Sequence, residues 1–232
     1  TSKTIKAVCD HSEAKKIIIV SRHAHDDIID YEMALKQSDV QVIINATPSG
    51  MYPHNEACPI DLSYFTSCEA VVDVIYNPLK TQLLIDAEKM GVKTANGLLM
   101  LVAQAKFAAD KFLDKVLDDN LILPIYQNLL KDYTNIVLIG MPSSGKSTLG
   151  EVLSKEFNKQ LIDIDTVIEE NAQKSIPEIF AEYGEPYFRQ LEHEAVLSTA
   201  KDTHLVIAAG GGSILNPANV RALQQNGILF FI

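Results

Sequence analysis

The segment Gly140–Ser147 restricts the fold of this chain more than any other part of the sequence. It reads Gly-Met-Pro-Ser-Ser-Gly-Lys-Ser and matches the pattern G-x-x-x-x-G-K-[ST]. An apolar run, Asn135–Ile139, precedes it, and a stretch with helical periodicity, about Lys146–Phe157, follows it. A strand, a glycine-rich turn and a helix in this order form a loop that binds phosphate groups. The alternative is a glycine-rich turn before an ordinary helix, but the flanking elements favour the phosphate loop.

Each residue type in this loop suits the binding of phosphate groups. The glycines let successive backbone N–H groups curve around phosphate oxygens at the positive end of a helix. Lys146 is placed to reach the β- and γ-phosphates of a nucleotide, and the Ser147 hydroxyl is placed to bind Mg²⁺. The residues predicted to surround the nucleotide are Gly140, Ser143, Ser144, Gly145, Lys146, Ser147 and Thr148.

Apolar β-branched runs alternate with amphipathic stretches along the whole chain, a pattern typical of βα units with a mostly parallel sheet. The fold class is therefore α/β throughout. The expected strands are Lys16–Ser21, Val40–Asn45, Val71–Tyr76, Val92–Ala95, Asn135–Ile139, Gln160–Asp163, Leu205–Ala208 and Ile228–Ile232. The expected helices are, approximately, Ser2–Ser12, Thr81–Met90, Leu98–Phe112, Asn120–Lys131, Lys146–Phe157, Thr166–Ala172, Ile176–Tyr183, Pro186–Ala200 and Pro217–Gln225. Thr166 and Glu169 fit a capping box.

A polar stretch, Asp114–Asn120, lies between strong elements and is followed by a short helix and a new strand. We therefore expect two domains, residues 1–133 and residues 134–232. The chain opens on a helix and closes inside the apolar run Leu229–Ile232. From these two ends we expect both domains to be incomplete parts of a longer protein.

The composition limits the possible partners. Twenty Lys and Arg residues against 30 Asp and Glu residues give a formal net charge of −10, which repels a nucleic-acid backbone or an anionic membrane. We therefore expect neither partner, and an anionic ligand needs a local binding device. No apolar run approaches the roughly 20 residues of a membrane span. The cysteines Cys9, Cys58 and Cys68 have no metal-site spacing, which favours reduced thiols in the cytoplasm.

Two carboxylates follow the next predicted strand after the phosphate loop. Asp163 and Asp165 are two residues apart, so they share one side of an extended chain. One could support Mg²⁺ while the other orients a substrate hydroxyl and accepts its proton. In the alternative interpretation, Asp165 only helps to start the helix that follows.

Two further features lie downstream. Arg189 could bind an anion, or it could form ordinary surface ion pairs with Glu185 and Glu192 at helical spacing. The run Gly210–Gly212 follows another predicted strand and could be a plain turn or a set of backbone donors that holds an anion.

In this order and near this spacing, these features resemble shikimate kinase over essentially all of Asn135–Ile232. The resemblance also rests on the stretches Ile176–Phe180 and Gly184–Glu192, which match the family pattern. It implies a P-loop kinase domain with a parallel sheet. The family's lid arginine and adenine-binding segment have no counterpart before Ile232.

The resemblance assigns roles to the residues already singled out. Lys146 and Asp165 become the catalytic residues, with Asp165 acting on the 3-hydroxyl of shikimate. Ser147 and Asp163 become the Mg²⁺ ligands. The shikimate site of the kinase is formed by Asp165, Arg189, Gly210, Gly211 and Gly212, with Arg189 on the substrate carboxylate.

Three segments of the first half carry patterns of their own. An Asn-Ala-Thr-Pro-Ser-Gly turn, Asn45–Gly50, follows one predicted strand, and the sequence Tyr76–Pro78 ends another. A predicted helix over Gly97–Ala105 places Met100 and Gln104 four residues apart on one face. Taken singly, these features also fit a generic turn, a core methionine and a solvated glutamine.

Together the three segments resemble the nucleotide-binding half of shikimate dehydrogenase, from about Ser2 to Lys131. The resemblance implies an incomplete Rossmann-like domain that binds NADP(H) across its strand ends. The implied cofactor residues are Ser21, Arg22, Asn45, Thr47, Gly97 and Met100. Arg22 would pair with the 2′-phosphate instead of being an ordinary surface charge, and Tyr76 and Gln104 would reach shikimate.

The two resemblances imply a bifunctional enzyme of aromatic amino-acid biosynthesis. One half would reduce 3-dehydroshikimate to shikimate with NADPH, and the other would phosphorylate shikimate with ATP and Mg²⁺. Two alternatives stay open. One is a non-catalytic sensor of shikimate or nucleotide that keeps both binding folds, and the other is a related phosphate-loop kinase for another small hydroxy acid, or a dehydrogenase that prefers quinate. The presence of Lys146, Ser147, Asp163 and Asp165 argues against the sensor.

Overall fold

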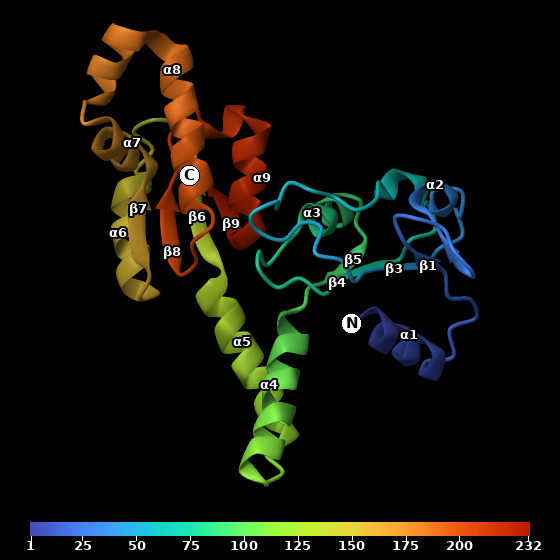
Figure 1. Cartoon of the computed structure of the whole chain (residues 1–232). Helices are drawn as coiled ribbons and strands as arrows, with labels where there is room; N and C mark the ends of the chain where they lie inside the picture. The colour runs from blue at the N-terminus through green and yellow to red at the C-terminus, as the bar shows by residue number, and fades with distance from the viewer. The chain divides into compact units, whose positions relative to one another are not determined.

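A computed structural model describes residues 1–232 (Figure 1). The chain divides into two compact units, Thr1–Ala105 and Lys106–Ile232. The predicted domain boundary after residue 133 lies further along the chain and stays a prediction. Both units are built from parallel strands and helices, so the α/β fold class is confirmed. No helix is long and apolar enough to cross a membrane.

The first unit contains a three-stranded parallel sheet of order β3-β4-β5. Helix α3 packs on β4 and β5, and its side chains Leu83 and Leu84 are buried against Val71 and Leu62. The strands of this unit are β1 (Ile19–Val20), β2 (Ile28–Ile29), β3 (Val42–Asn45), β4 (Ala70–Asp73) and β5 (Lys93–Ala95). Its helices are α1 (Ser2–His11), α2 (Tyr31–Ala34), η1 (Leu62–Tyr64), α3 (Gln82–Lys89) and the beginning of α4 (Leu98–Leu113).

The first expected strand of this unit is shorter than predicted. Only Ile19–Val20 is extended with a partner, and that partner is β2, which the sequence analysis did not predict. No hydrogen-bonded ladder joins β1 to β3. A strand persists only where its backbone groups find partners, and Ile28–Ile29 offers just two residues. The prediction of a full strand over Lys16–Ser21 is therefore wrong.

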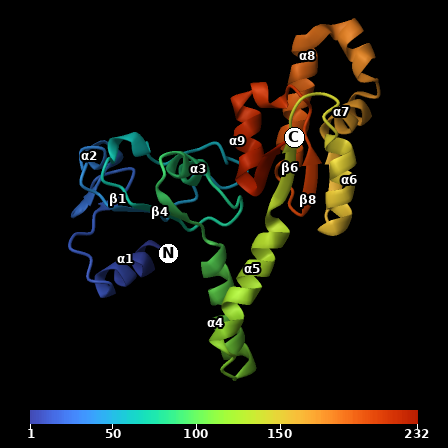
Figure 2. The same cartoon turned by 180° about the vertical axis from the view of Figure 1, so that it is seen from behind.

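The second unit contains a four-stranded parallel sheet of order β7-β8-β6-β9. Its strands are β6 (Asn135–Ile139), β7 (Gln160–Asp163), β8 (Leu205–Ala208) and β9 (Gly227–Phe231). Its helices are η2 (Asp119–Leu121), α5 (Ile122–Tyr133), α6 (Lys146–Glu156), α7 (Ile164–Ala172), α8 (Ile176–Thr199), η3 (Ser213–Leu215) and α9 (Pro217–Asn226). Helices α6 and α9 lie on either side of the strands in both views (Figures 1 and 2).

Apolar residues of the second unit form one core. Val137 and Ile207 from the sheet pack with Ile164, Ile179 and Val196 from α7 and α8, and all five are fully buried. At the usual 25 cal/mol per Å² of buried apolar area, each such side chain contributes about 1.5–3 kcal/mol. This core fixes the helices that carry the polar residues described below.

Helix α8 bends at Gly184, whose φ of +78° and ψ of 176° are not helical (Figures 1 and 2). The two helices predicted over 176–183 and 186–200 correspond to its two arms. Pro186 sits in the first turn after the bend, where its missing N–H is tolerated.

The predicted capping box at Thr166 is wrong. Helix α7 begins earlier, at Ile164, because the side chain of Asp163 caps it by accepting a hydrogen bond from the Asp165 N–H. A capping box is formed instead at the start of α8, by Ser175 and Glu178.

Candidate functional site

Three polar segments meet at one edge of the sheet in the second unit. The phosphate loop follows β6, Asp163 ends β7, and the glycine run follows β8. These three strands are neighbours in the order β7-β8-β6 and run in the same direction. Since parallel strands end at the same edge of a sheet, the topology places the three segments together.

The phosphate loop has the strained backbone that its sequence pattern predicts. Gly140, Ser143 and Gly145 all have positive φ values, of 146°, 63° and 89°. A Cβ on Gly140 would lie 2.3 Å from the Ile232 carbonyl oxygen, so only glycine fits there. Gly145 is the N-cap of α6, which directs the positive end of that helix into the loop.

Lys146 lies across this loop. Its Nζ donates to the carbonyl oxygens of Gly140, at 3.1 Å, and of Met141, at 2.7 Å. These bonds hold the ammonium group with main-chain carbonyls and not with a carboxylate. The charge is therefore kept inside the curve of the loop, where it can move to an anion without breaking an ion pair.

Ser147 and Asp163 form a direct pair. The Ser147 hydroxyl donates to Asp163 Oδ2 at 2.8 Å, while Asp163 Oδ1 accepts from the Asp165 N–H at 3.0 Å. No group of three or more His, Cys, Asp or Glu side chains could hold a metal ion. Mg²⁺ in nucleotide sites takes only one or two protein oxygens and completes its shell with phosphate and water. One hydroxyl beside one carboxylate fits that donor set.

Asp165 lies half-buried next to this pair. Burial raises the pKa of its carboxyl above the ordinary value, and the neighbouring charges of Asp163 and Glu192 raise it further. The ammonium group of Lys146 opposes this rise. A Cβ on Gly210 would come within 2.9 Å of Asp165 Oδ1, so the glycine run directly borders the carboxylate.

Arg189 stands at the other side of the glycine run. A Cβ on Gly212 would lie 2.2 Å from Arg189 Nη1, so the guanidinium group packs on the backbone of this loop. Arg189 pairs with Glu185 through Nη2 at 3.0 Å and with Glu192 through Nη1 at 2.9 Å. Both pairs that the alternative interpretation proposed are therefore present, but only Glu185 is a surface residue. The Glu192 side chain is 2% exposed.

The glycine run and the phosphate loop also contact each other. A Cβ on Gly211 would lie 2.7 Å from Cδ of Pro142 in the phosphate loop. Consequently the segment that borders Arg189 and Asp165 is packed against the segment that carries Lys146.

Sequence reasoning missed Ser213 and did not foresee that Glu192 is buried. The Ser213 hydroxyl donates to Glu192 Oε1 at 2.7 Å, and both residues are almost completely buried. The spacing of Glu192 from Arg189 predicted a surface ion pair. A usable signal was the position of Glu192 on the face of α8 that carries the buried residues Phe188, Ala195 and Val196.

In the first unit, Asn45 organises the turn after β3. Its Oδ1 accepts from the N–H and hydroxyl of Thr47, and its Nδ2 donates to the carbonyl of Ser49 and to Asp73. All its polar atoms are thus used inside the protein. What Asn45 and Thr47 can offer a ligand is the shape of the turn and its backbone.

Asp73 is the buried centre of this network. It is 0% exposed and accepts hydrogen bonds from Asn45 Nδ2, from the Ile75 N–H and from the Thr81 hydroxyl. Burial raises the pKa of its carboxyl, and the three hydrogen bonds oppose that rise. Asp73 joins the ends of β3 and β4 to the start of α3.

Of the remaining predicted residues of the first unit, Gly97 is buried and most of the others are exposed. The N–H of Gly97 donates to the Ile75 carbonyl, and a Cβ on Gly97 would lie only 1.9 Å from the Val74 carbonyl oxygen. Ser21 is half-buried, and the exposed residues are Arg22, Tyr76, Met100 and Gln104. Arg22 follows β1, so no ladder relates it to Asn45 at the end of β3.

The residues of the first unit fit a dinucleotide only in part. Arg22 supplies one exposed cation, and the turn after β3 supplies backbone groups. The three glycines of this unit, Gly50, Gly91 and Gly97, are far apart in sequence and form no phosphate-binding loop.

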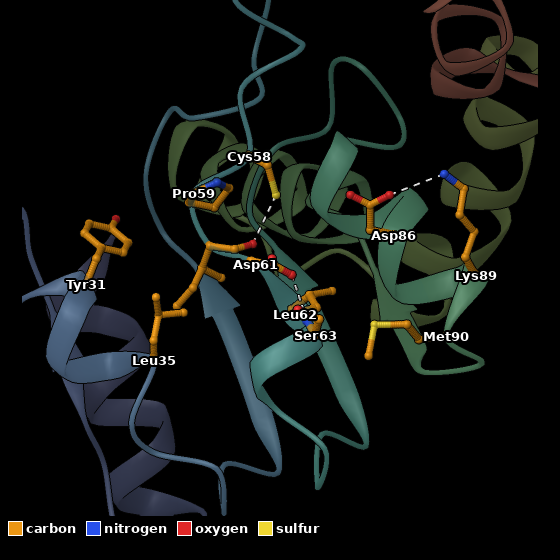
Figure 3. A pocket seen from close by; sticks show the side chains of 11 residues that line it. Tyr31, Leu35, Cys58, Pro59, Asp61, Leu62, Ser63, Asp86, Lys89 and Met90 are labelled. Carbon is orange, nitrogen blue, oxygen red and sulfur yellow. Dashed lines mark hydrogen bonds and ion pairs between the residues drawn. The ribbon is translucent and has the colours of Figure 1, made fainter. Parts of the chain in front are cut away.

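A cavity of about 680 Å³ lies elsewhere in the first unit (Figure 3). Its lining includes Tyr31, Cys58, Asp61 and Met90, and no predicted site residue lines it. The Ser63 N–H donates a hydrogen bond to the Asp61 carboxylate. Burial raises the pKa of the Cys58 thiol, which makes this thiol a poor nucleophile. These side chains do not indicate a catalytic role for the cavity.

Comparison with known proteins relates the two ends of the chain to two different families. The family model described as shikimate kinase matches residues 142–232, in the half where the sequence predicted it. A shikimate kinase from Clostridium botulinum (strain Alaska E43 / Type E3) is 48% identical over 97 residues, which cover 42% of this chain and 58% of that protein. The chain thus spans less than two thirds of the length of the curated relatives that it matches.

Two solved structures resemble the N-terminal part. Shikimate dehydrogenase 1 from Peptoclostridium difficile is 34% identical with a TM-score of 0.52, covering 55% of this chain and 50% of its own. A chorismate mutase/shikimate 5-dehydrogenase fusion protein from Clostridium acetobutylicum is 35% identical with a TM-score of 0.50, covering 54% and 47%. The chain therefore resembles shikimate dehydrogenase in its N-terminal part and shikimate kinase over residues 142–232.

Proposed function

We propose that the second unit transfers the γ-phosphoryl group of ATP to the 3-hydroxyl group of shikimate. One observation carries this proposal: the phosphate loop packs directly against a glycine run that borders both a carboxylate, Asp165, and a guanidinium group, Arg189. A phosphate site, a proton acceptor and a carboxylate binder are the parts that a kinase for a hydroxy acid needs. The match of residues 142–232 to shikimate kinase supports this assignment.

Each residue then has a defined task. The backbone N–H groups of the loop and Lys146 hold the phosphates, and Ser147 with Asp163 would hold Mg²⁺. Bound MgATP supplies the phosphoryl group and neutralises its developing charge. Catalysis by the protein is therefore mainly positioning and electrostatic stabilisation.

Asp165 is the proposed acceptor of the proton from the 3-hydroxyl group. Its raised pKa makes its carboxylate a stronger base than an exposed aspartate. Arg189 is the proposed partner of the substrate carboxylate. Three of its five N–H donors are used by Glu185 and Glu192, which leaves two for a ligand.

The test is shikimate-dependent release of ADP by the natural chain that contains these residues, because the relatives are longer than this match. We expect turnover, and we expect Lys146→Met to reduce it by about 10³-fold or more while shikimate binding persists. Arg189→Ala is expected to weaken shikimate binding by about tenfold or more. Shikimate binding without any turnover in the unmodified protein would favour the sensor. Turnover of another hydroxy acid but not of shikimate would contradict the substrate assignment.

For the first unit, we propose a part in the NADPH-dependent reduction of 3-dehydroshikimate to shikimate. The 34% and 35% identity to solved dehydrogenases supports this proposal. NADPH and NADH binding, measured by the fluorescence of the reduced nicotinamide, tests it. Arg22→Ala is expected to remove a preference for NADPH, and equal affinity of the unmodified protein for both cofactors would contradict the predicted role of Arg22.

A further inference from the structure

A chain of buried polar side chains lies behind the glycine run of the second unit. It starts at His193 on α8, continues through Asn219 on α9 and Ser213 in η3, and returns to Glu192 on α8. Asn219, Ser213 and Glu192 are 1%, 0% and 2% exposed. Buried polar groups are costly unless they are hydrogen-bonded, so the geometry of each link is strongly determined.

The direction of each hydrogen bond follows from the donors. Asn219 Nδ2 donates to the Ser213 carbonyl oxygen at 3.1 Å, so Asn219 Oδ1 is the atom that faces His193 Nδ1, at 2.6 Å. An amide oxygen can only accept, so this short contact requires a proton on His193 Nδ1, and the Asn216 Nδ2 group at 3.5 Å from the same nitrogen then donates no hydrogen bond to it. The imidazole thus fixes the orientation of the Asn219 amide, and the amide fixes the turn at Ser213.

The next links determine how Arg189 is held. Ser213 Oγ donates to Glu192 Oε1 at 2.7 Å, and Arg189 Nη1 donates to Glu192 Oε2 at 2.9 Å. Because Ser213 occupies one carboxylate oxygen, Glu192 engages the guanidinium group through the other oxygen alone. The remaining partner of Arg189 is Glu185, whose side chain is 63% exposed and easily exchanged for a ligand.

Loss of Asn219 would undo this arrangement. The turn at Ser213 would keep its backbone bonds, from the Ser213 N–H to Gly210 and from the Leu215 N–H to Gly212, but it would lose the bond from Asn219. The Ser213 hydroxyl would then be less firmly placed as the donor to the buried Glu192 Oε1. The nearest cation is Arg189, so Glu192 would take a second guanidinium N–H, since bidentate arginine–carboxylate pairs are the favoured geometry. Fewer donors would then face an incoming carboxylate.

We propose that Asn219, with its amide oriented by His193, is a positioning residue that sets the affinity of this pocket for the carboxylate of the acceptor. The inference rests on the proposed function of the second unit. It assigns a role to two side chains that do not touch the substrate.

The test compares the affinity for shikimate with that for its uncharged methyl ester, measured by calorimetry. For Asn219→Ala we expect the dissociation constant of shikimate to rise about three- to tenfold, and that of the ester to stay unchanged. The matched control is Asn226→Ala. Asn226 lies on the same helix, is 2% exposed and also donates to a carbonyl oxygen at 3.1 Å, that of Ala200. The Asn226→Ala variant should have a lower melting temperature and an unchanged preference for shikimate over its methyl ester.

Two variants of His193 separate positioning from general loss of packing. His193→Asn retains an N–H donor near the place of Nδ1 and should keep the acid preference, whereas His193→Leu should reduce it in the same direction as Asn219→Ala. If the unmodified protein binds shikimate, and Asn219→Ala and Asn226→Ala prefer shikimate over its methyl ester to the same extent, the positioning role of Asn219 is overturned while the proposed function stands. If the unmodified protein binds neither compound, the proposed function fails first and this inference falls with it.

Discussion

At the scale of single residues, the same physical cause appears at Asp165 and at Asp73. Asp73 is buried at the end of β4, Asp165 is half-buried in the first turn of α7, and burial raises the pKa of both carboxyls. Asp73 is compensated by three hydrogen bonds from Asn45, Ile75 and Thr81, whereas Asp165 faces three further negative charges, those of Asp163, Glu192 and Glu169. Asp73 therefore stabilises a turn, while Asp165 retains the reactivity that a proton acceptor needs.

Asp165→Asn should consequently make the protein more stable and less active. A raised pKa means that the folded state favours the protonated form, so the stability associated with Asp165 is complete below its ordinary pKa of 3.8 and is lost as the pH rises through the raised value. Above that range, the neutral amide should raise the free energy of unfolding by about 0.5–2 kcal/mol. Urea unfolding at several pH values measures this difference.

The dependence of stability on pH and the rate of phosphoryl transfer both test the prediction for Asp165→Asn. Below pH 3.8 the difference in stability between the two proteins should shrink, because the Asp165 carboxyl then becomes protonated in the unfolded as well as in the folded state. Phosphoryl transfer should fall about 10²- to 10⁴-fold in the variant. A variant that is less stable at pH 8, or equally active, would show that Asp165 is a structural carboxylate and not the proton acceptor.

At the scale of elements, the bend in α8 depends on Gly184. Its φ of +78° and ψ of 176° lie in a region that is essentially restricted to glycine. Space is not the constraint, since the nearest atom to a Cβ there would be Pro186 Cδ at 3.8 Å. The rings of Phe180 and Phe188, with centroids 4.7 Å apart, then pack across the bend.

Gly184→Ala should therefore destabilise the second unit by about 1–3 kcal/mol through backbone strain. Asparagine often replaces glycine at left-handed positions, but it does not fit this extended ψ, so Gly184→Asn should be no better. Thermal unfolding of both variants tests this. Recovery of stability by asparagine would mean that the bend uses an ordinary left-handed residue.

The strands of the second unit could be predicted from the sequence to within a residue or two. The polar segments that follow three of these strands indicated where the candidate site lies. Continuous apolar runs such as Asn135–Ile139 and Leu205–Ala208 are typical of strands in a buried parallel sheet, and both segments form such strands. The strand after Lys16 could not be predicted, because its length depends on a partner and not on its own residues. The start of α7 was misplaced because Asp163, and not Thr166, caps the helix. The polar chain from His193 to Glu192 depends on contacts between α8 and α9, which no local pattern encodes.

At the scale of the whole molecule, the excess of negative charge means that anions are held only by local devices. With a net charge of −10, the chain offers no broad basic field, and the loop amides, Lys146 and Arg189 must do this work in the second unit. The division into units decides which segments those devices depend on. The predicted boundary after residue 133 excludes α5 from the second unit, whereas the compact unit begins at Lys106.

Lys159 distinguishes the two boundaries. It is 7% exposed, and its Nζ donates to the carbonyl oxygens of Lys131 and Asp132 at the C-terminal end of α5, at 2.9 and 3.0 Å. Burial lowers the pKa of this ammonium group, so it needs these acceptors. A protein of residues 134–232 lacks both carbonyls and should be less stable than one of residues 106–232 by about 1–3 kcal/mol.

A cycle of four proteins isolates this contact from the other effects of removing α5. Lys159→Met should destabilise residues 106–232, because two hydrogen bonds are lost, yet it should be neutral or stabilising in residues 134–232, where the ammonium group has no acceptor. Lys155→Met, on the exposed face of α6, should have the same effect in both lengths. If Lys159→Met also has the same effect in both, α5 is not part of the folded second unit and the boundary after residue 133 is the correct one.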